Sequence, residues 1–355
     1  MKKIILKNLS LKEITANIQR AGFSAYRGKQ IFHWLFTKGV RSIGEMKNLS
    51  DDIKEYLTRN TEIGGISNIE KILSSSDGTK KILYRLSDNN FIEGVLMREK
   101  NWWTICVSTQ VGCPLGCIFC STGKGGFIRN LTISEIVDQI LITNKEIIQK
   151  ENSEKIRNVV LMGMGEPFLN TENVIKALRL MVAPDGMALS PRRITVSTAG
   201  IIEGIKKLSD ANVGVNLAIS LNAVDNATRD KLMPINKKYP IEKIITTCKE
   251  FPLTNRRRIT FEYILIEGIN DSAQEAKKLS TLLRGFPCKI NLIPFNIHPS
   301  SAFVPPTSET IEHFREILSR ANFTVAIRYS KGVDILAACG QLAGHIREST
   351  ENLSP

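Results

Sequence analysis

The sequence has no long hydrophobic run, no internal repeat, no low-complexity segment and no long linker. Because a transmembrane helix needs about 20 consecutive apolar residues, none is expected. The opening MKKIILKNLSLKE also holds too short an apolar run for a signal peptide, since Lys7 interrupts it. With 355 residues the chain can bury a full core, and its length suggests two or three domains. We therefore expect a cytoplasmic protein that has no membrane partner.

Acidic residues are outnumbered: 35 Asp and Glu stand against 48 Lys and Arg, which gives a formal net charge of +13. An excess of this size favours a polyanionic partner, either RNA or DNA, although a basic surface without such a partner is the alternative. Basic clusters lie at Arg192-Arg193, Lys237-Lys238 and Arg256-Arg257-Arg258, and single basic residues at Arg27, Lys29 and Lys38. Each could meet phosphates or could simply be a solvated face.

Histidine is scarce, with four in the chain and none near the densest group of cysteines. The cysteine count, seven, is odd, and four of the cysteines crowd between Cys106 and Cys120. This distribution argues for metal and redox chemistry in a reducing compartment and against a disulfide framework.

The cysteines centre on GCPLGCIFCSTGKGGFIR, residues 112–129, where Cys113, Cys117 and Cys120 have a C-x-x-x-C-x-x-C spacing. A short loop of this spacing can turn three thiolates toward one point. Three thiolates on a four-iron, four-sulfur cluster leave one iron open to a small molecule. Structural zinc is the alternative, but it usually takes four ligands in paired C-x-x-C spacing, and no second pair exists. The spacing therefore favours an iron–sulfur cluster.

Residues 1–65 are expected to form a small helical domain. Ser10 and Glu13 have the spacing of a capping box, and the apolar residues that follow recur at the helical period. A second helix is expected in AYRGKQIFHWLFTKG, ending near Gly39, and a third around residues 53–57.

Residues 66–98 change character, because short β-rich runs (ILYRL, FIEGVLM) alternate with the turn-rich SSSDGTKK and SDNN. We expect a β-hairpin extension here. Glu93 lies among apolar neighbours in the second run, and the alternation of a strand by itself suggests that it faces water.

From residue 99 to 345 strands and helices alternate, and residues 346–355 are left as a C-terminal tail. The apolar runs are WTICVST, NVVLMG, ITVSTAG, VNLAISLN, ITFEYILI, KINLIPF and TVAIRYS. Helical patterns lie between them, the best of which begins with a capping box at Thr132 and Glu135. This alternation predicts an α/β fold with a parallel sheet, open or closed into a barrel.

Polar and glycine residues follow the ends of these strands, where parallel α/β folds bind ligands. They are Gly165, Glu166, Ser197, Ser220, Leu221, Asn222 and Asn296. Each alone is more often a helix cap or a turn former. Together, around the cysteine loop, they predict a cofactor-binding rim in which a glycine backbone approaches the ligand and the Glu166 carboxylate holds a cationic amine.

Two further cysteines are candidates for chemistry. Cys339 lies in DILAACGQL, where small neighbours and a following glycine suit an accessible loop thiol. Cys106 comes seven residues before the cysteine loop and is either a strand thiol or a redox partner. A small buried core residue is the alternative for both, and it is what we expect of Cys248 and Cys288.

The cysteine triad and Phe119 resemble the signature of radical S-adenosylmethionine (SAM) enzymes. The segments YRGKQIFHWLF, MGMGEP, INKKYPIE, PCKINLIPFN and AACGQLAG extend the resemblance over almost the whole chain, to the RlmN/Cfr family of RNA methyltransferases. The resemblance implies a partial (β/α)6 barrel with an N-terminal accessory domain that is similar to helix-hairpin-helix modules. It implies methylation of carbon 2 of an adenosine in 23S rRNA, near the peptidyl-transferase centre, and of the adenosine 3′ of certain tRNA anticodons.

The resemblance also implies roles for single residues. Cys113, Cys117 and Cys120 bind a 4Fe-4S cluster, and Gly165, Glu166, Ser197, Ser220, Leu221, Asn222 and Asn296 contact SAM. Cys339 carries the methyl group, Cys106 closes a disulfide with it late in turnover, and Glu93 accepts the substrate proton. Two positions depart from the family pattern. Asn222 stands in place of a histidine, which points to contact through the backbone, and Leu336 stands in place of an aspartate that supports the Cys339 loop.

The implied mechanism answers a chemical difficulty, since carbon 2 of adenine is electron-poor and no nucleophile. Cys339 first takes a methyl group from one SAM by displacement. A second SAM, cleaved to a 5′-deoxyadenosyl radical, activates that methyl group for addition to the ring. Two SAM are consumed per turnover, and a flavodoxin or ferredoxin supplies electrons to an enzyme expected to be monomeric.

Two alternatives stay open at this level. A Cfr-like enzyme would methylate carbon 8 of the same ribosomal adenosine with nearly the same motifs. A protein of another class, a zinc-stabilised RNA-binding protein without catalysis, would need only the basic charge and cysteine ligands.

Overall fold

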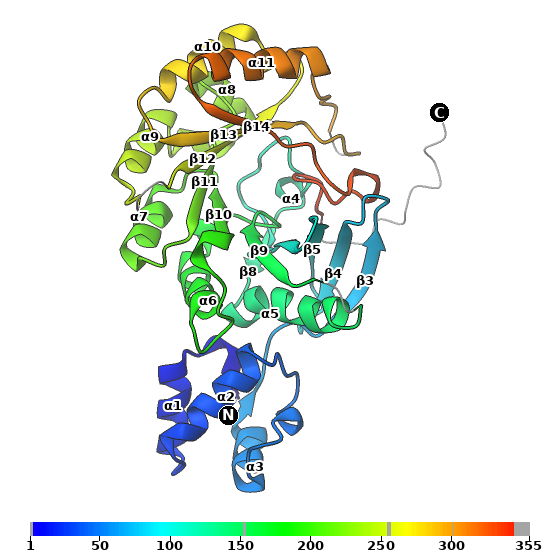
Figure 1. The fold of residues 1–355 in the computed structure, drawn as a ribbon, viewed down its shortest axis with the longest axis vertical. Helices are drawn as coiled ribbons and strands as arrows, with labels where there is room; N and C mark the ends of the chain where they lie inside the picture. The colour runs from blue at the N-terminus through cyan, green and yellow to red at the C-terminus, as the bar shows by residue number, and fades with distance from the viewer. Residues whose placement is uncertain (1–2, 152–153, 254–256, 300, 344–355) are drawn as a thin grey trace.

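The computed structural model describes residues 3–151, 154–253, 257–299 and 301–343. The expected C-terminal tail and Arg256 lie outside this part. Figure 1 shows a small group of N-terminal helices beside a larger α/β body, with α5 and α6 nearest to them.

The N-terminal region consists of helices joined by a short parallel strand pair. Its elements are β1 (Ile4–Ile5), α1 (Leu11–Arg20), α2 (Ala25–Phe36), α3 (Asp51–Asn60) and β2 (Thr61–Glu62). The capping box predicted at Ser10 and Glu13 is formed, and all the expected helices are present. Helix α2 ends at Phe36, before the predicted Gly39, because Thr37 and Lys38 both bond back to the His33 carbonyl and close the last turn.

The body is built on a 10-stranded sheet in the order β14-β13-β12-β11-β10-β9-β6-β5-β4-β3. The parallel strands are β6 (Trp103–Cys106), β9 (Ile156–Leu161), β10 (Ile194–Thr198), β11 (Asn216–Ser220), β12 (Ile259–Leu265), β13 (Cys288–Pro294) and β14 (Thr324–Ile327). They coincide with the apolar runs of the sequence, so the predicted α/β fold is confirmed. The sheet is open, since β14 ends it on one side and β6 continues into β5 on the other.

Helices connect each parallel strand to the next. They are α5 (Ile133–Thr143), α6 (Thr171–Val182), α7 (Ile202–Ala211), α8 (Asn226–Leu232), α9 (Ile241–Glu250), α10 (Ala273–Leu282) and α11 (Ser308–Arg320). Because the strands are consecutive in the chain and parallel, their carboxyl ends meet at one edge of the sheet. The capping box of Thr132 and Glu135 begins α5, as predicted.

The strands of the hairpin region belong to the same sheet. β3 (Asn68–Ser74), β4 (Lys80–Arg85) and β5 (Phe91–Arg98) pair antiparallel, and β5 pairs with β6 through Val95 and Cys106. This register continues the parallel sheet past β6, so that residues of β5 lie beside the first strand of the body. The limits set between the domains stay predictions.

The helices of the described residues are all too short or too polar to cross a membrane.

Candidate active site

The cysteine loop lies between two short antiparallel strands, β7 (Gln110–Gly112) and β8 (Phe127–Asn130). Gly112 has a φ of +74°, and a Cβ there would lie 1.9 Å from the Gly126 carbonyl oxygen. Only glycine fits this close approach. The Cys113 amide donates to the same oxygen at 2.8 Å, which closes the loop at its base.

The three loop cysteines lie close enough to one another to interact electrostatically. Cys113 and Cys117 are buried and Cys120 is half-buried. Burial, together with the neighbouring Cys120, raises the pKa of Cys113 to about 12. Burial also raises the pKa of Cys117, with Cys120 and Cys113 acting in the same direction. Thiolates held together in this way require a cationic ligand to keep them ionised.

An iron–sulfur cluster fits this donor set better than zinc. Within the described ranges no three His, Cys, Asp or Glu side chains are placed to hold one metal ion. A structural zinc would need four ligands converging on a single point. A four-iron cluster takes each thiolate on a different iron, so the cysteines can stand further apart. The apolar residues packed around Cys117 are Phe119, Ala199, Leu232, Met233, Ile266 and Phe295, and they give the dry surroundings that a cluster needs.

The C-terminal loop that carries Cys339 is fastened to the cysteine loop. The Ser121 amide donates to the Gly340 carbonyl at 2.7 Å, and Thr122 Oγ1 donates to the Leu342 carbonyl at 2.6 Å. Gly340 has a φ of +84°, and a Cβ there would lie 3.2 Å from the Phe119 carbonyl oxygen. The glycine after Cys339 is therefore what lets the two loops approach.

His298 secures the far side of the cysteine loop, a role that no sequence pattern indicates. The imidazole contacts Ser121 Oγ at 3.0 Å through Nδ1 and the Phe119 carbonyl at 3.2 Å through Nε2. A buried ring that bonds both residues flanking Cys120 fixes the direction of that thiol.

Cys339 and Cys106 lie near enough to each other to interact electrostatically. The Cys339 side chain is exposed, and Asn296 Nδ2 donates to its carbonyl at 3.0 Å. Cys106 is buried at the end of β6. Burial raises the pKa of Cys106, and the nearby Cys339 raises it further.

Both thiols are free, as are all the other cysteines. The disulfide bond that the resemblance implies is therefore not a feature of this structure, in which one thiol is exposed on a loop and the other is buried in the sheet. A disulfide formed transiently in turnover stays a prediction.

Cys339 is a weak nucleophile in this state. Although water reaches its side chain, the surrounding protein raises its pKa to about 11, and the charges of Glu262 and Cys120 act in the same direction. Burial raises the pKa of Glu262 itself to about 7. Glu262 lies on β12, and it is a carboxyl near Cys339 that titrates close to neutral pH.

Glu93 is buried, which overturns the expectation from strand alternation that it faces water. Its Oε1 pairs with Lys81 Nζ at 2.8 Å, and its Oε2 accepts from the Ala343 amide at 2.7 Å. Lys81 also donates to the Leu336 carbonyl at 3.1 Å. The Glu93–Lys81 pair therefore holds the segment that carries Cys339 at two points, Leu336 and Ala343. The sequence does not indicate Lys81, because only the pairing of β4 with β5 brings it to Glu93.

At Leu336 the loop is held through the backbone carbonyl, which needs no acidic side chain at this position. Asp334 binds the turn between β3 and β4. Asp334 Oδ1 accepts from Ser75 Oγ at 2.5 Å, and Oδ2 accepts from the Ser76 amide at 3.2 Å.

The glycine-rich end of β9 forms one side of the predicted rim. Gly165 has a φ of +97°, and a Cβ there would lie 2.5 Å from Gln110 Cβ. Glu166 is buried, and its oxygens accept from the Phe168 amide at 3.0 Å and the Ala199 amide at 2.8 Å. Burial raises its pKa, while those amides oppose the rise. In this structure the carboxylate joins the ends of β9 and β10, and binding of an amine by Glu166 stays a prediction.

The ends of β10 and β11 meet where the rim was predicted. Ser197 Oγ and Ser220 Oγ lie 3.5 Å apart, and the Leu221 amide donates to the Glu262 carbonyl at 3.0 Å. Asn222 has a φ of +59° and is buried, and its Oδ1 accepts from the Ile264 amide at 2.9 Å. Its side chain is thus engaged by the fold, which favours contact with a ligand through its backbone.

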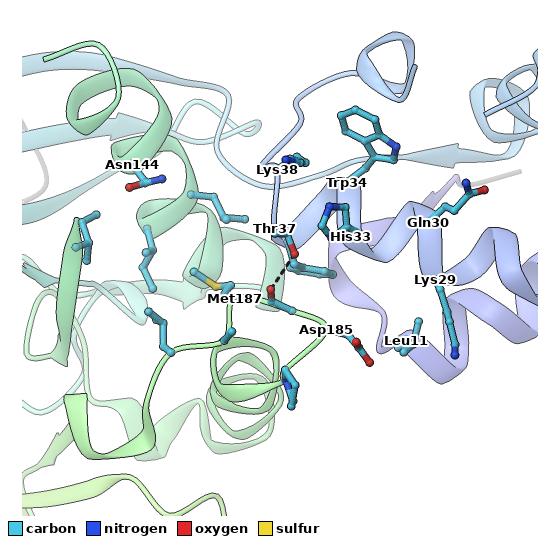
Figure 2. A pocket seen from close by; sticks show the side chains of 18 of the residues that line it. Leu11, Lys29, Gln30, His33, Trp34, Thr37, Lys38, Asn144, Asp185 and Met187 are labelled. Carbon is cyan, nitrogen blue, oxygen red and sulfur yellow. Dashed lines mark hydrogen bonds between the residues drawn. The ribbon is translucent and has the colours of Figure 1, made fainter. Parts of the chain in front are cut away.

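A cleft of about 1140 Å³ separates α2 from the body (Figure 2). Exposed Lys29, Lys38 and Lys155 line it together with His33, Trp34 and Asp185. Thr37 Oγ1 spans it by donating to the Gly186 carbonyl at 3.0 Å. Ile156 is the first residue of β9 and also lines the cleft. The cleft therefore lies at the amino ends of the strands, opposite to the cysteine loop.

Comparisons with known proteins identify two families along the chain. Residues 4–63 match the ribosomal RNA large subunit methyltransferase N-terminal domain, and residues 107–279 match the radical SAM superfamily. The dual-specificity RNA methyltransferase RlmN of Geotalea uraniireducens is 44% identical over 352 residues, 99% of this chain and 100% of that protein. The protein of the same name from Desulfosudis oleivorans is 46% identical over 360 residues, 99% of this chain and 96% of that protein.

A solved structure agrees with these sequence relatives. The crystal structure of a radical SAM methyltransferase from Sphaerobacter thermophilus is 39% identical, with a TM-score of 0.91 over 96% of this chain and 100% of that one.

Proposed function

This chain belongs to the RlmN family of radical SAM RNA methyltransferases, and we propose that it methylates carbon 2 of adenosine in 23S rRNA and in tRNA. The observation that carries the proposal is that two loops are in contact. Backbone hydrogen bonds join the loop of the cysteine triad to the loop that carries the exposed Cys339, and Cys106 is near enough to interact with Cys339 electrostatically. A zinc-stabilised RNA-binding protein would not require the thiols of Cys339 and Cys106 beside the cysteine triad. The relatives carry the RlmN name, so the Cfr-like alternative has no support from them.

Cys113, Cys117 and Cys120 would hold the 4Fe-4S cluster, and the rim from Gly165 to Asn296 would hold SAM. When bound, these groups supply the methyl carbon and a one-electron route to a carbon radical. The protein supplies position, and the apolar residues around Cys117 exclude water. We propose that two SAM are used in each turnover.

Cys339 acts as methyl carrier. Its thiolate would attack the methyl carbon of SAM, the bond from that carbon to the sulfonium would break, and S-adenosylhomocysteine would leave, so that Cys339 becomes a thioether on the C-terminal loop. The high pKa of Cys339 means that this step needs a proton acceptor. Its place beside the cysteine loop keeps the thioether close to where hydrogen abstraction occurs.

Glu93 and Cys106 complete the reaction after the methylene carbon has bonded to carbon 2. Glu93, which pairs with Lys81, would take the proton from carbon 2, and the unpaired electron that the radical addition leaves on the ring would return to the iron–sulfur cluster. Cys106 loses its proton, and its sulfur bonds to the Cys339 sulfur. The sulfur–carbon bond breaks, its electron pair stays with the carbon, and that carbon takes up a proton to become the methyl group. The disulfide left behind is reduced before the next turnover.

The partners follow from this chemistry. Ribosomal RNA and tRNA are the substrates, and a flavodoxin or ferredoxin is the proposed electron donor to a monomeric, cytoplasmic enzyme. The excess of basic residues suits the RNA partner.

The proposal is tested by identifying the product nucleoside. Purified protein with SAM and a reductant should convert adenosine in 23S rRNA and tRNA transcripts to 2-methyladenosine, detected by mass spectrometry of digested RNA. Exclusive 8-methyladenosine, or no methylation by cluster-loaded protein, would contradict the proposed function.

Cluster binding gives a second prediction. Reconstituted protein should carry about four irons per chain, as the cluster stoichiometry requires. Cys117→Ala should lose most of that iron, while Cys248→Ala, which changes another buried cysteine, should keep it. Zinc in place of iron, or iron unchanged in Cys117→Ala, would show that the triad does not hold a cluster.

The cleft beside α2 gives a third prediction. If its lysines bind RNA phosphates, Lys29→Glu combined with Lys38→Glu should weaken RNA binding and lower the slope of log affinity against log salt by about one for each phosphate that is no longer neutralised. Lys277→Glu combined with Lys278→Glu, the same change of charge on the outer helix α10, is the control. An equal weakening of RNA binding in the two proteins would mean that net charge, and not the cleft, binds RNA.

A further inference from the structure

Arg229 is a fully buried cation. It lies on α8, and its five N–H groups meet five oxygen acceptors. These are the carbonyls of Leu221 (2.9 Å), Ala199 (2.6 Å), Ser220 (3.1 Å) and Tyr239 (3.4 Å) and the side-chain oxygen of Asn236 (2.9 Å). None of these oxygens is charged, and among the described residues no carboxylate lies within ion-pair distance of the guanidinium. A buried charge of this kind is costly unless an anion is brought near it.

The cysteine loop is the place where such an anion would be bound. The Ile118 amide donates to the Leu232 carbonyl at 3.1 Å, which ties the loop to the end of α8. Leu232 follows Arg229 by three residues on α8, the Ala199 carbonyl accepts from Arg229, and both residues belong to the same buried apolar cluster as Cys117. Burial lowers the pKa of Arg229 to about 10, and the charges of Cys117 and of Asp230, the next residue on α8, oppose that change, so the guanidinium is charged at neutral pH.

We propose that Arg229 is a positioning residue for the iron–sulfur cluster: its buried charge stabilises the ligated thiolates and raises the reduction potential of the cluster. This inference rests on the proposed function, because it presupposes a cluster on Cys113, Cys117 and Cys120. The same guanidinium holds the carbonyls of Ala199, Ser220 and Leu221, so it also fixes the rim on which SAM is expected.

The direction of the effect follows from charge. Reduction adds one electron to a cluster that three thiolates already make negative. A cation buried in low dielectric nearby favours the reduced state, and water screens it far less than a surface charge. The sequence gives no sign of this role, because nothing in RDKLMPIN shows that Arg229 is buried while Lys231, two residues later, is exposed.

The test separates charge from geometry with three variants. Arg229→Gln removes the charge, Arg229→Lys keeps the charge but loses the planar fork, and Lys231→Gln removes an exposed charge from the same helix. Each reconstituted protein is titrated anaerobically with reductant, and the reduced cluster is followed by electron paramagnetic resonance. Arg229→Gln should lower the equilibrium constant for reduction at least tenfold, a one-electron shift of about 59 mV. Lys231→Gln should match the unchanged protein, and Arg229→Lys should stay within about threefold of it, roughly half of that shift.

Arg229→Lys should nevertheless bind SAM more weakly, since the strand-end carbonyls lose most of their donors. A cluster reduction potential that is unchanged in Arg229→Gln overturns the proposal. An equal shift of the reduction potential in Arg229→Lys and Arg229→Gln also overturns it. If Arg229→Gln does not fold or does not retain iron, the reduction potential of Arg229→Lys tests the proposal. A tenfold or larger fall in its equilibrium constant for reduction, with the positive charge still present, contradicts the role assigned to that charge. Absence of a cluster from the unchanged protein would instead contradict the proposed function.

Discussion

Cys339→Ala is expected to abolish methylation and to leave no protein–RNA adduct, whereas Cys106→Ala should accumulate a covalent adduct. Loss of the methyl carrier stops the reaction before RNA is touched. Loss of the second thiol stops it afterwards, when a carbon bridge already joins the Cys339 sulfur to carbon 2. The adduct should appear as slow-migrating protein on a denaturing gel, shortened by ribonuclease, and 2-methyladenosine should fall below detection in both variants.

The matched control is Cys288→Ala, which removes a buried sheet cysteine at the start of β13. It should cost some stability but leave turnover and trap no RNA. The proposed division of labour rests on an exposed Cys339 and on a buried Cys106 that is near enough to interact with it electrostatically. If neither variant traps RNA and both retain turnover once folding is controlled, the methyl-cysteine mechanism does not operate in this protein.

The parts of the fold that sequence predicted are those set by local pattern. Apolar runs became the parallel strands, and the capping boxes at Ser10 and Thr132 are formed, because both signals depend on residues within a few positions of one another. The cysteine loop was recognisable for the same reason, since its three cysteines lie within eight residues of sequence.

What sequence could not predict depends on pairing between distant segments. Glu93 reads as a strand residue facing water, yet the meeting of β5 with β6 and the C-terminal loop buries it against Lys81. In the sequence, Arg229 is one of several charged residues of a polar helix. Only the packing of α8 against the strand ends brings five oxygen acceptors to its guanidinium. The role of His298 could not be predicted either, because its hydrogen-bond partners lie more than 170 residues away in the sequence.

The attachment of the N-terminal region to the body is also non-local, and it includes one buried ion pair. Lys7 Nζ bonds Asp138 Oδ1 on α5, with side chains that are 1% and 4% exposed. Asp138 Oδ2 also accepts from the Ile66 amide at 3.0 Å, so a single carboxylate serves two segments. Gly65 has a φ of +99°, and a Cβ there would lie 2.3 Å from the same oxygen, which explains why the chain has glycine at this approach.

Removing either charge of this pair should therefore destabilise the protein strongly. Lys7→Met leaves a buried carboxylate without its cation, and Asp138→Asn leaves a buried ammonium, and each should lower the free energy of unfolding by about 3–5 kcal/mol. The double variant Lys7→Met with Asp138→Asn removes both charges while the Asn oxygen still accepts from the Ile66 amide, so it should recover most of that stability.

Chemical denaturation of the cluster-loaded protein measures all three variants, with Lys145→Met as the control, since it breaks a half-exposed pair with Glu45. Additive destabilisation in the double variant would show that the pair is not coupled. A coupled destabilisation together with weakened RNA binding in each single variant would show that this ion pair holds the N-terminal helices where RNA meets them.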